Sequence, residues 1–389
     1  MLAVSKLLIP VLLAATGIGA VGVWDRLAFG KAQLAFGSYV PWGLWVGLYI
    51  YLVGVSGGAF LVAFLHYGLG MRALRRAARY AVLAALMSLG AGLTLVLLDL
   101  GQMSRFWTLY VRTNPTSLLG WMVWVYTTYA LVLVAMLAAM ALDKPKALRG
   151  LAWAGLALVV TFGGGEGALF GVLGSKPFWN SGILPVRFLF AAFLSGVAVV
   201  TFATALFRRW PADAEAADAG RFLRQALLAL LAVNLVIEFA DVSVTLYTGL
   251  PAVAEAYRLI LFGPHAWLFW GGQVAMGLVL PVALLAMPSG GRPAIAGAAG
   301  FLIALGYAAS KQNVVLPGLA IPEFRTLPDA FVHARLSAVY FPSPTEWLVA
   351  VGVVAGAALA FIVAIEALPF LTKHDTRGTS TPERPRLVA

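Results

Sequence analysis

The stretch PWGLWVGLYIYLVGVSGGAFLVAFLHY, residues 41–67, decides the fold class of this chain. It runs for 27 residues without an Asp, Glu, Lys or Arg. The hydrocarbon core of a bilayer is about 30 Å thick, and a helix needs roughly 20 apolar residues to cross it. The stretch therefore predicts a membrane-spanning helix.

Comparable stretches recur along the whole chain. The composition is 61% hydrophobic and 11% charged, whereas soluble domains are about half apolar and about one quarter charged. The sequence thus predicts an all-α integral membrane protein with about ten transmembrane helices. We expect the spans at residues 5–24, 41–67, 80–101, 117–142, 150–173, 184–207, 223–246, 265–288, 294–312 and 345–371.

Lys and Arg residues collect on one side of these predicted spans. Because basic loops favour the cytoplasmic side, we expect both termini to be cytoplasmic, in the inner membrane of a bacterium. This topology also accounts for the net charge of +11, so we expect membrane lipid and no nucleic acid as a partner. The polar tail, residues 373–389, is expected to be disordered.

A faint internal repeat suggests how the spans are grouped. Trp121 to Trp124 and Trp267 to Trp270 open two spans in a similar way, and Ser-Gly pairs occur at 56–57 and 195–196. Parallel repeats of this kind occur in membrane proteins. We expect two four-helix bundles plus two flanking helices. The first transmembrane helix and an outer loop occupy residues 1–40, and the two bundles occupy 41–174 and 175–312. An outer loop at 313–344 then leads to the last helix at 345–372. The loop 313–344 is interpreted as a lid or docking surface, or as an interfacial loop with an aromatic belt.

Ionisable residues inside spans are costly and usually functional. Here they concentrate in the expected outer half, and the inner half offers mainly His66 and Glu366. A site for a lipid-soluble molecule with a polar head needs polar groups at one depth only, whereas a transporter needs them at the midplane or along the path. The outer set comprises Asp99, Glu166, Glu238, Asp241, His265, Gln273, Lys311, Gln312 and Glu346.

Each candidate also has a structural interpretation. Asp99 could pair with Arg105, Glu346 could complement the first turn of its helix, and His265 could be an interfacial side chain. Glu238 and Asp241 lie nearly one turn apart and share a helix face. Glu166 is the least easily explained by structure alone, because it lies among glycines at 163–167 that allow a backbone or a flat ring to approach closely.

The residue types also limit the cofactors. Cysteine is absent, which excludes an iron–sulfur cluster held by this chain and a cysteine-ligated metal. A transmembrane b-type haem needs two ligands at matching depth. Because His66, His265, His333 and His374 offer no such pair, we expect no haem and no metal site.

Several motifs follow one another at a characteristic spacing along the spans. They are PWGLWVGLYIYLVGVSGGAF at 41–60, LDLGQ at 98–102 with RFW at 105–107, GALFG at 167–171 with PFWN at 177–180 and LP at 184–185, FWGG at 269–272 with GLVLP at 277–281, and YFPSPTEW at 340–347. In their order and spacing the chain resembles the NrfD/PsrC family, the membrane subunits of polysulfide-reductase-type respiratory complexes. Ten spans and the last motif are typical of the longer, ten-helix branch of that family.

The resemblance implies a quinone or quinol site without haem, with menaquinone or ubiquinone as its ligand. It also implies a four-cluster iron–sulfur subunit on the nearby membrane face and a molybdopterin-type catalytic subunit behind it. Some members of the family place Tyr or His just before the GALFG-like stretch, where this chain has Gly165 and Glu166. Either another residue supplies that donor, or Glu166 takes the proton role.

These considerations lead to a set of site hypotheses. A carboxyl group in a poorly hydrated site can exchange protons near neutral pH, so Glu166 and Asp99, followed by Glu238 and Asp241, are the proton-exchange candidates. His265, Gln273 and Glu166 are expected at the quinone head group, with Tyr39 and Trp42 at its entrance. The alternatives are a secondary transporter and a purely structural membrane anchor.

Overall fold

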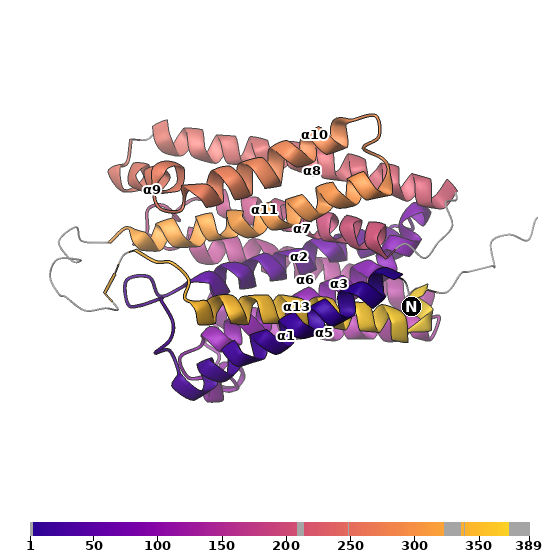
Figure 1. The fold of residues 1–389 in the computed structure, drawn as a ribbon, viewed down its shortest axis with the longest axis horizontal. Coiled ribbons are helices and arrows are strands. Elements are labelled where there is room, and N and C mark those ends of the chain that lie inside the picture. The colour runs from indigo at the N-terminus through magenta and orange to yellow at the C-terminus, as the bar shows by residue number, and fades with distance from the viewer. Residues whose placement is uncertain (1–2, 208–213, 248, 323–335, 338, 373–389) are drawn as a thin grey trace, which may run out of the picture.

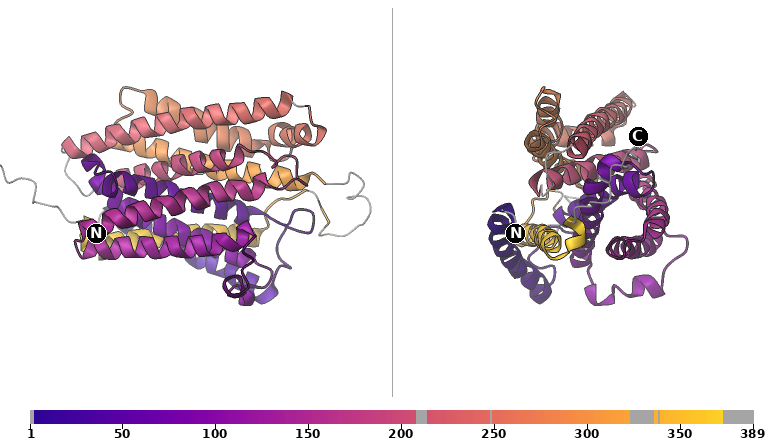
Figure 2. Two further views of the ribbon diagram at one scale, coloured as in Figure 1. Left: turned by 180° about the vertical axis from the view of Figure 1, so that it is seen from behind. Right: turned by 90° about the vertical axis from the view of Figure 1, so that its right-hand side faces the viewer.

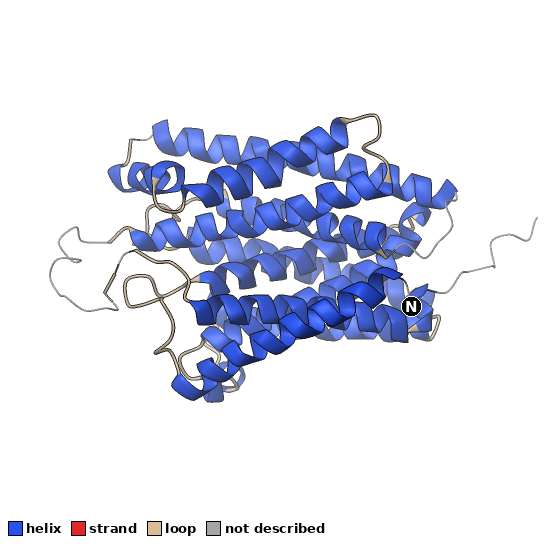
Figure 3. Cartoon of the chain, viewed as in Figure 1, coloured by secondary structure: helices blue, strands red, loops and turns tan. Residues whose placement is uncertain are grey.

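The computed structural model describes residues 3–207, 214–247, 249–322, 336–337 and 339–372. All regular secondary structure in these ranges is helical (Figure 3). Ten helices in them are long and apolar enough to cross a membrane. The prediction of an all-α integral membrane protein is thereby confirmed.

The helices follow one another in a simple order. The ten long ones are α1 (Ala3–Phe29), α2 (Leu44–Tyr67), α3 (Arg75–Asp99), α5 (Leu118–Ala141), α6 (Pro145–Gly171), α7 (Leu184–Leu206), α8 (Ala214–Tyr247), the π-helical segment η3 (Leu268–Val279) continued by α10 (Leu280–Ala286), α11 (Pro293–Ala320) and α13 (Pro344–Ala367). The short ones are η1 (Arg72–Leu74), η2 (Met103–Arg105), α4 (Thr108–Val111), α9 (Pro251–Phe262) and α14 (Pro369–Thr372).

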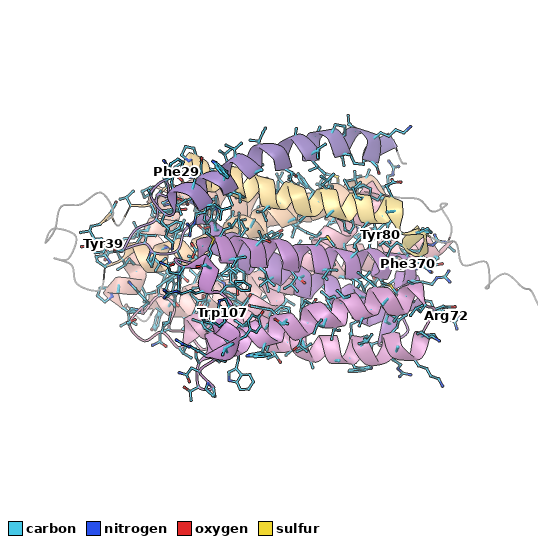
Figure 4. The ribbon with its side chains drawn as sticks, turned by 90° about the horizontal axis from the view of Figure 1, so that it is seen from below. Phe29, Tyr39, Arg72, Tyr80, Trp107 and Phe370 are labelled. Carbon is cyan, nitrogen blue, oxygen red and sulfur yellow. The ribbon has the colours of Figure 1, made fainter. Side chains whose placement is uncertain are left out.

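The long helices lie roughly side by side, so the molecule has two ends (Figure 1). We call one the basic end, because α1 begins there and it carries the arginines that precede and open α3, Arg72 among them (Figure 4). We call the other the aromatic end; it carries the connections 30–43, 100–117, 172–183 and 249–267, the first of which includes Tyr39 (Figure 4).

We name two sets of helices after the bundles expected from the sequence, without taking the contacts as a division. The first group is α2, α3, α5 and α6, and the second is α7, α8, η3–α10 and α11. Helices α1 and α13 pack on each other, and α13 reaches α3 (Figure 2). The two groups meet chiefly where α7 packs on α2 and α6 and where α11 packs on α2.

Glycine allows the close approach of α2 and α7. A Cβ atom added to Gly196 would lie 2.0 Å from the Ala59 nitrogen, and one added to Gly58 would lie 2.0 Å from the Ala192 oxygen. Small residues of this kind let membrane helices pack backbone against backbone. Gly196 of the second Ser-Gly pair thus lies at the contact of α7 with α2, whereas Gly57 of the first pair faces Val159 and Phe162 of α6.

Helix α11 is longer than the sequence suggested. We expected the ninth span to end at residue 312, yet the helix continues to Ala320 and includes Pro317. The polar run that suggested a boundary is inside the protein instead: Lys311, Gln312 and Asn313 are about as buried as the apolar residues around them. The part of the expected loop at 323–335 and 338 lies outside the described residues.

The glycine contact between α2 and α7 generates a stability prediction. Gly196→Ala would force the two backbones apart, and we expect it to cost about 1–3 kcal/mol, the usual scale of overpacking. The measurement is the temperature at which the purified protein loses its monodisperse elution peak in detergent. Gly90→Ala in α3 is the matched control, because no atom lies within 4 Å of a Cβ added there. An equal effect of both substitutions would contradict the close contact.

Candidate functional site

A small cavity opens at the aromatic end between α9, α11 and the segment that precedes α13. Its volume is about 130 Å³, close to the roughly 150 Å³ in which an engineered protein cavity holds a benzene ring. The cavity therefore has the size of a single six-membered ring. It is lined by Val40, Leu259, Ile260, Pro264, His265, Asn313, Leu316, Pro317, Ala320, Val339 and Tyr340.

His265 belongs to the lining of this cavity. Its Nε2 lies 2.8 Å from the Tyr340 carbonyl oxygen. Because a carbonyl can only accept, Nε2 is the donor in this contact. That His265 binds a head group stays a prediction.

A hydrogen-bonded chain leads from the cavity into the second group of helices. The Asn313 amide donates to Gln273 Oε1 at 3.1 Å, and the Gln273 amide donates to Glu238. Gln273 belongs to η3, and π-helical turns shift the direction of side chains and recur at functional sites. The structure thus brings together three of the predicted residues, His265, Gln273 and Glu238, by way of Asn313.

Arg187 is the residue that sequence reasoning missed. Its guanidinium contacts Glu238 at 3.1 Å and Asp241 at 2.9 Å, which explains why these two acids share a helix face. The signal was present in the sequence, since Arg187 is a lone cation near the start of an apolar span. Burial, followed by the nearby Asp241, raises the pKa of Tyr257 to about 12, so this side chain beside the ion pair remains protonated.

Glu166 lies in the first group of helices and is only 3% exposed. The Tyr126 hydroxyl donates to Glu166 Oε1 at 2.8 Å, and the Tyr49 and Tyr126 hydroxyl oxygens are 2.9 Å apart. Gly165 leaves room for Met122, whose Cε would lie 2.1 Å from an added Cβ. Tyr126 of α5 therefore places a hydroxyl donor beside Glu166, next to the GALFG stretch at 167–171.

Trp42 belongs to an aromatic cluster that includes Phe170, which follows Glu166 by one turn in α6. Its ring stacks on Trp179 with centroids 6.0 Å apart and meets the edge of Phe170 at 5.9 Å. The Trp179 indole donates to the Val314 oxygen of α11 at 2.7 Å. Tyr39 is half-buried and directly precedes Val40, which lines the cavity.

Asp99 and Glu346 form a separate cluster with the first helix. The cations that face Asp99 are Lys31 and Arg26, and in the described part of the chain Arg105 forms no ion pair with it, so the alternative of an Asp99–Arg105 pair is wrong. Asp99 Oδ1 is buried without a hydrogen-bond partner. Glu346 accepts from the Ala35 amide at 2.6 Å and from the Tyr340 hydroxyl; its role is therefore to tie loops together as well as to open α13.

A second cavity lies at the basic end, where the sequence offered mainly His66 and Glu366. It has a volume of about 850 Å³ and includes Arg76, Thr201, Thr204, Glu215 and Ser289 in its lining. It lies between the first turns of α3, α8 and α11 and the last turns of α7.

Two of the four histidines lie at opposite ends of the molecule. His66 is near the basic end, where Nδ1 lies 3.0 Å from the Met71 oxygen, and His265 is at the aromatic end. His333 and His374 lie outside the described residues. Among the residues that the structure does describe, no group of three or more His, Asp or Glu side chains is arranged to hold a metal ion.

Comparison with known proteins identifies relatives that span nearly the whole chain. A protein of Mesobacillus selenatarsenatis that is part of a selenate reductase is 30% identical, covering 94% of this chain and 95% of that protein. The integral membrane subunit of a menaquinone reductase of Nitratidesulfovibrio vulgaris is 25% identical, covering 92% and 90%. The integral membrane subunit of an Hdr-like menaquinol oxidoreductase of Archaeoglobus fulgidus is 24% identical, covering 86% of this chain and 86% of that protein. The family model described as polysulphide reductase, NrfD, matches residues 34–323, and the chain therefore belongs to the NrfD family.

Proposed function

We propose that this chain is the membrane subunit of a respiratory oxidoreductase complex, which binds quinone or quinol at the aromatic end and exchanges electrons with an iron–sulfur partner. One observation carries the proposal: in a member of the NrfD family, a ring-sized cavity is joined by hydrogen bonds to a carboxylate within an apolar span at the same end. The menaquinone and menaquinol complexes named for two relatives support the choice of quinone.

The cavity suits the head group of a quinol. The polar partners would be His265 Nδ1, an acceptor for a hydroxyl, and the Asn313 side chain, while Ile260, Leu316 and Pro317 provide apolar walls. The isoprenoid tail would remain in the membrane. Menaquinol and ubiquinol both carry two ring hydroxyl groups, so the cavity residues would bind either by hydrogen bonding; the second, fused ring of menaquinol would lie outside the ring-sized cavity.

Protons must leave the site when a quinol is oxidised, because it releases two protons with its two electrons. Glu166 is the best placed to exchange a proton, since it is buried beside a tyrosine donor and an ionised carboxylate there would be poorly hydrated. Glu238 is the carboxylate that hydrogen bonds connect to the cavity. We retain Asp99 and Asp241 as further proton-exchange candidates.

The electrons need a carrier outside this chain, because it has no cysteine to hold a cluster. The proposed partners are a four-cluster iron–sulfur subunit docked on the aromatic end and a molybdopterin-type catalytic subunit that contacts it. The basic end would face the cytoplasm of a bacterial cell and the aromatic end the outside. Both termini would then be cytoplasmic.

The cavity at the basic end favours a second candidate, a secondary transporter with one polar site near each end. A transporter would move a solute in the absence of quinol. A purely structural anchor would neither bind quinone nor respond to changes at Glu166.

Filling the cavity tests the head-group site directly. Ala320→Phe adds a ring to the cavity wall, and we expect it to weaken binding of a fluorescent hydroxyquinoline N-oxide probe at least ~10-fold, which is about 1.4 kcal/mol. The assay is probe titration of the purified complex. Ala141→Phe, at the exposed end of α5, is the control. Unchanged probe binding in an assembled Ala320→Phe complex would show that the head group does not bind in this cavity, and the Trp42 cluster would become the next candidate.

Replacing the ionisable carboxyl group of Glu166 tests its proposed role in proton exchange. Glu166→Gln keeps the volume and hydrogen-bonding capacity but cannot ionise, so quinol-driven electron transfer should fall roughly 10²-fold or more, the scale of lost acid–base catalysis. Rates are normalised to the amount of assembled complex. Glu255→Gln in α9, an exposed acid at the same end, should be nearly silent. Normal turnover in a fully assembled Glu166→Gln complex would rule the role out.

The docking face can be read from chemical cross-links. With a lysine-specific reagent we expect links to the iron–sulfur subunit from Lys31 or Lys176, which lie in connections at the aromatic end. Lys144 and Lys146, between α5 and α6 at the basic end, serve as the internal comparison. Mass spectrometry of the digested complex identifies the linked pairs, and links from the basic end alone would show that docking occurs on the opposite face.

A further inference from the structure

Tyr340 connects the ring-sized cavity to the start of α2. Its carbonyl oxygen accepts a hydrogen bond from His265 Nε2 at 2.8 Å, and both residues line the cavity. Its hydroxyl group accepts from the Leu44 amide at 2.7 Å and donates to Glu346. Because the residue is only 3% exposed, these contacts are shielded from water, and one tyrosine links the cavity wall to two membrane helices.

The hydroxyl group of Tyr340 completes the first turn of α2. The first amides of a helix have no partner within it, and Gly43, which precedes Leu44, has no side chain that could cap them. The missing side chain also makes room, since a Cβ added to Gly43 would lie 2.3 Å from the Tyr340 hydroxyl oxygen. The tyrosine therefore takes the place of a capping side chain, although it comes from a segment about 300 residues away.

Glu346 is the second partner of this hydroxyl group. It is completely buried, and it also accepts from the Ala35 amide at 2.6 Å. Its backbone carbonyl oxygen accepts from the Trp45 indole at 2.9 Å. Leaving a buried acceptor of this kind without its donor is costly. The connection before α2, the start of α2 and the start of α13 are thus held together around the end of the Tyr340 side chain.

We propose that Tyr340 is a positioning residue for the head-group site. The inference rests on the proposed function, in which His265 meets the head group of a quinol. The Leu44 amide and Glu346 fix the hydroxyl end of the tyrosine, and the carbonyl oxygen of the same residue then holds the His265 ring in one orientation. A head group gains affinity from a ring that is already oriented, because less side-chain freedom is lost when it binds.

Tyr340→Phe tests this role, because it removes the hydroxyl group and keeps the ring and the carbonyl oxygen. In assembled complex we expect the KM for quinol to rise roughly 10-fold, the scale of one or two lost hydrogen bonds, with kcat nearly unchanged. Tyr80→Phe at the basic end (Figure 4) is the matched control, since Tyr80 is also buried and donates to the Phe207 oxygen at 3.1 Å. An unchanged KM in assembled Tyr340→Phe, or an equal rise in both variants, would overturn the proposal.

A double-mutant cycle tests whether Tyr340 acts through His265. His265→Ala removes the ring that Tyr340 is proposed to hold, so adding Tyr340→Phe to it should weaken binding of the hydroxyquinoline N-oxide probe by less than about 2-fold further. Additive effects of the two substitutions would show that the tyrosine acts on the cavity by another route and would contradict the proposal. Wild-type affinity of the His265→Ala complex would contradict it as well.

Hydrogen–deuterium exchange detects the same coupling without any substitution. Because coupling between two sites is reciprocal, probe binding should slow exchange of the Leu44 and Ala35 amides, whose acceptors are Tyr340 and Glu346, by at least ~5-fold. Amides of the connection between α5 and α6, at the basic end, are the internal reference. Saturating probe that leaves both amides unchanged would overturn the proposal. A wild-type complex that neither binds the probe nor oxidises quinol would instead overturn the proposed function, so the two failures are distinguishable.

Discussion

The cost of placing a charge inside a bilayer governs the arrangement of this protein. The Arg187 side chain lies within an apolar span and is only 16% exposed, and it is tolerated because Glu238 and Asp241 neutralise it at 3.1 and 2.9 Å. That ion pair fixes α7 against α8, and Glu238 in turn receives the Gln273 amide from η3. Three elements are therefore held by one cation. Removing one partner of a buried ion pair typically lowers the free energy of unfolding by about 3–5 kcal/mol. The relative positions of these side chains are therefore more strongly constrained than those of the surrounding apolar contacts.

Close helix packing makes this polar layer possible. Between helices in lipid there is little hydrophobic driving force, so contact depends on shape and on small residues. Gly58 and Gly196 bring α2 and α7 together, and Gly277 and Gly306 do the same for η3 and α11, where a Cβ added to Gly306 would lie 2.3 Å from a backbone atom. In the sequence, this second contact follows Gln273 by four residues in η3 and precedes Lys311 by five residues in α11, so both polar side chains lie about one turn from it on the side of the aromatic end. Glycine thus supplies the backbone proximity, and the long polar side chains cover the remaining distance.

Sequence reasoning succeeded where the signal was local. Long uncharged runs predicted the spans, and the glycine setting of Glu166 marked it as unusual, because both are properties of neighbouring residues. It failed where the signal depended on packing. The Lys311–Asn313 run looked like the polar end of a span, yet these residues face the interior and α11 continues to Ala320. Arg26 was not matched with Asp99, and Tyr126 was not matched with Glu166, because each pair joins helices whose relative rotation no single sequence reveals. The π-helical form of η3 is invisible to a pattern with a period of 3.6 residues.

One helix connects the two halves of the site because of its own periodicity. Residues two apart on an α-helix point about 200° away from each other. Lys311 therefore meets Phe188 while Asn313 meets Gln273 and the cavity. A shorter α11 that ended at residue 312 would lose the Asn313 contact and leave Gln273 Oε1 without its donor. The same helix carries Val314, whose oxygen holds Trp179 in the aromatic cluster beside Trp42. The last turns of α11, which the sequence suggested were a loop, are thus the element on which the cavity, the ion-pair group and the aromatic cluster all depend.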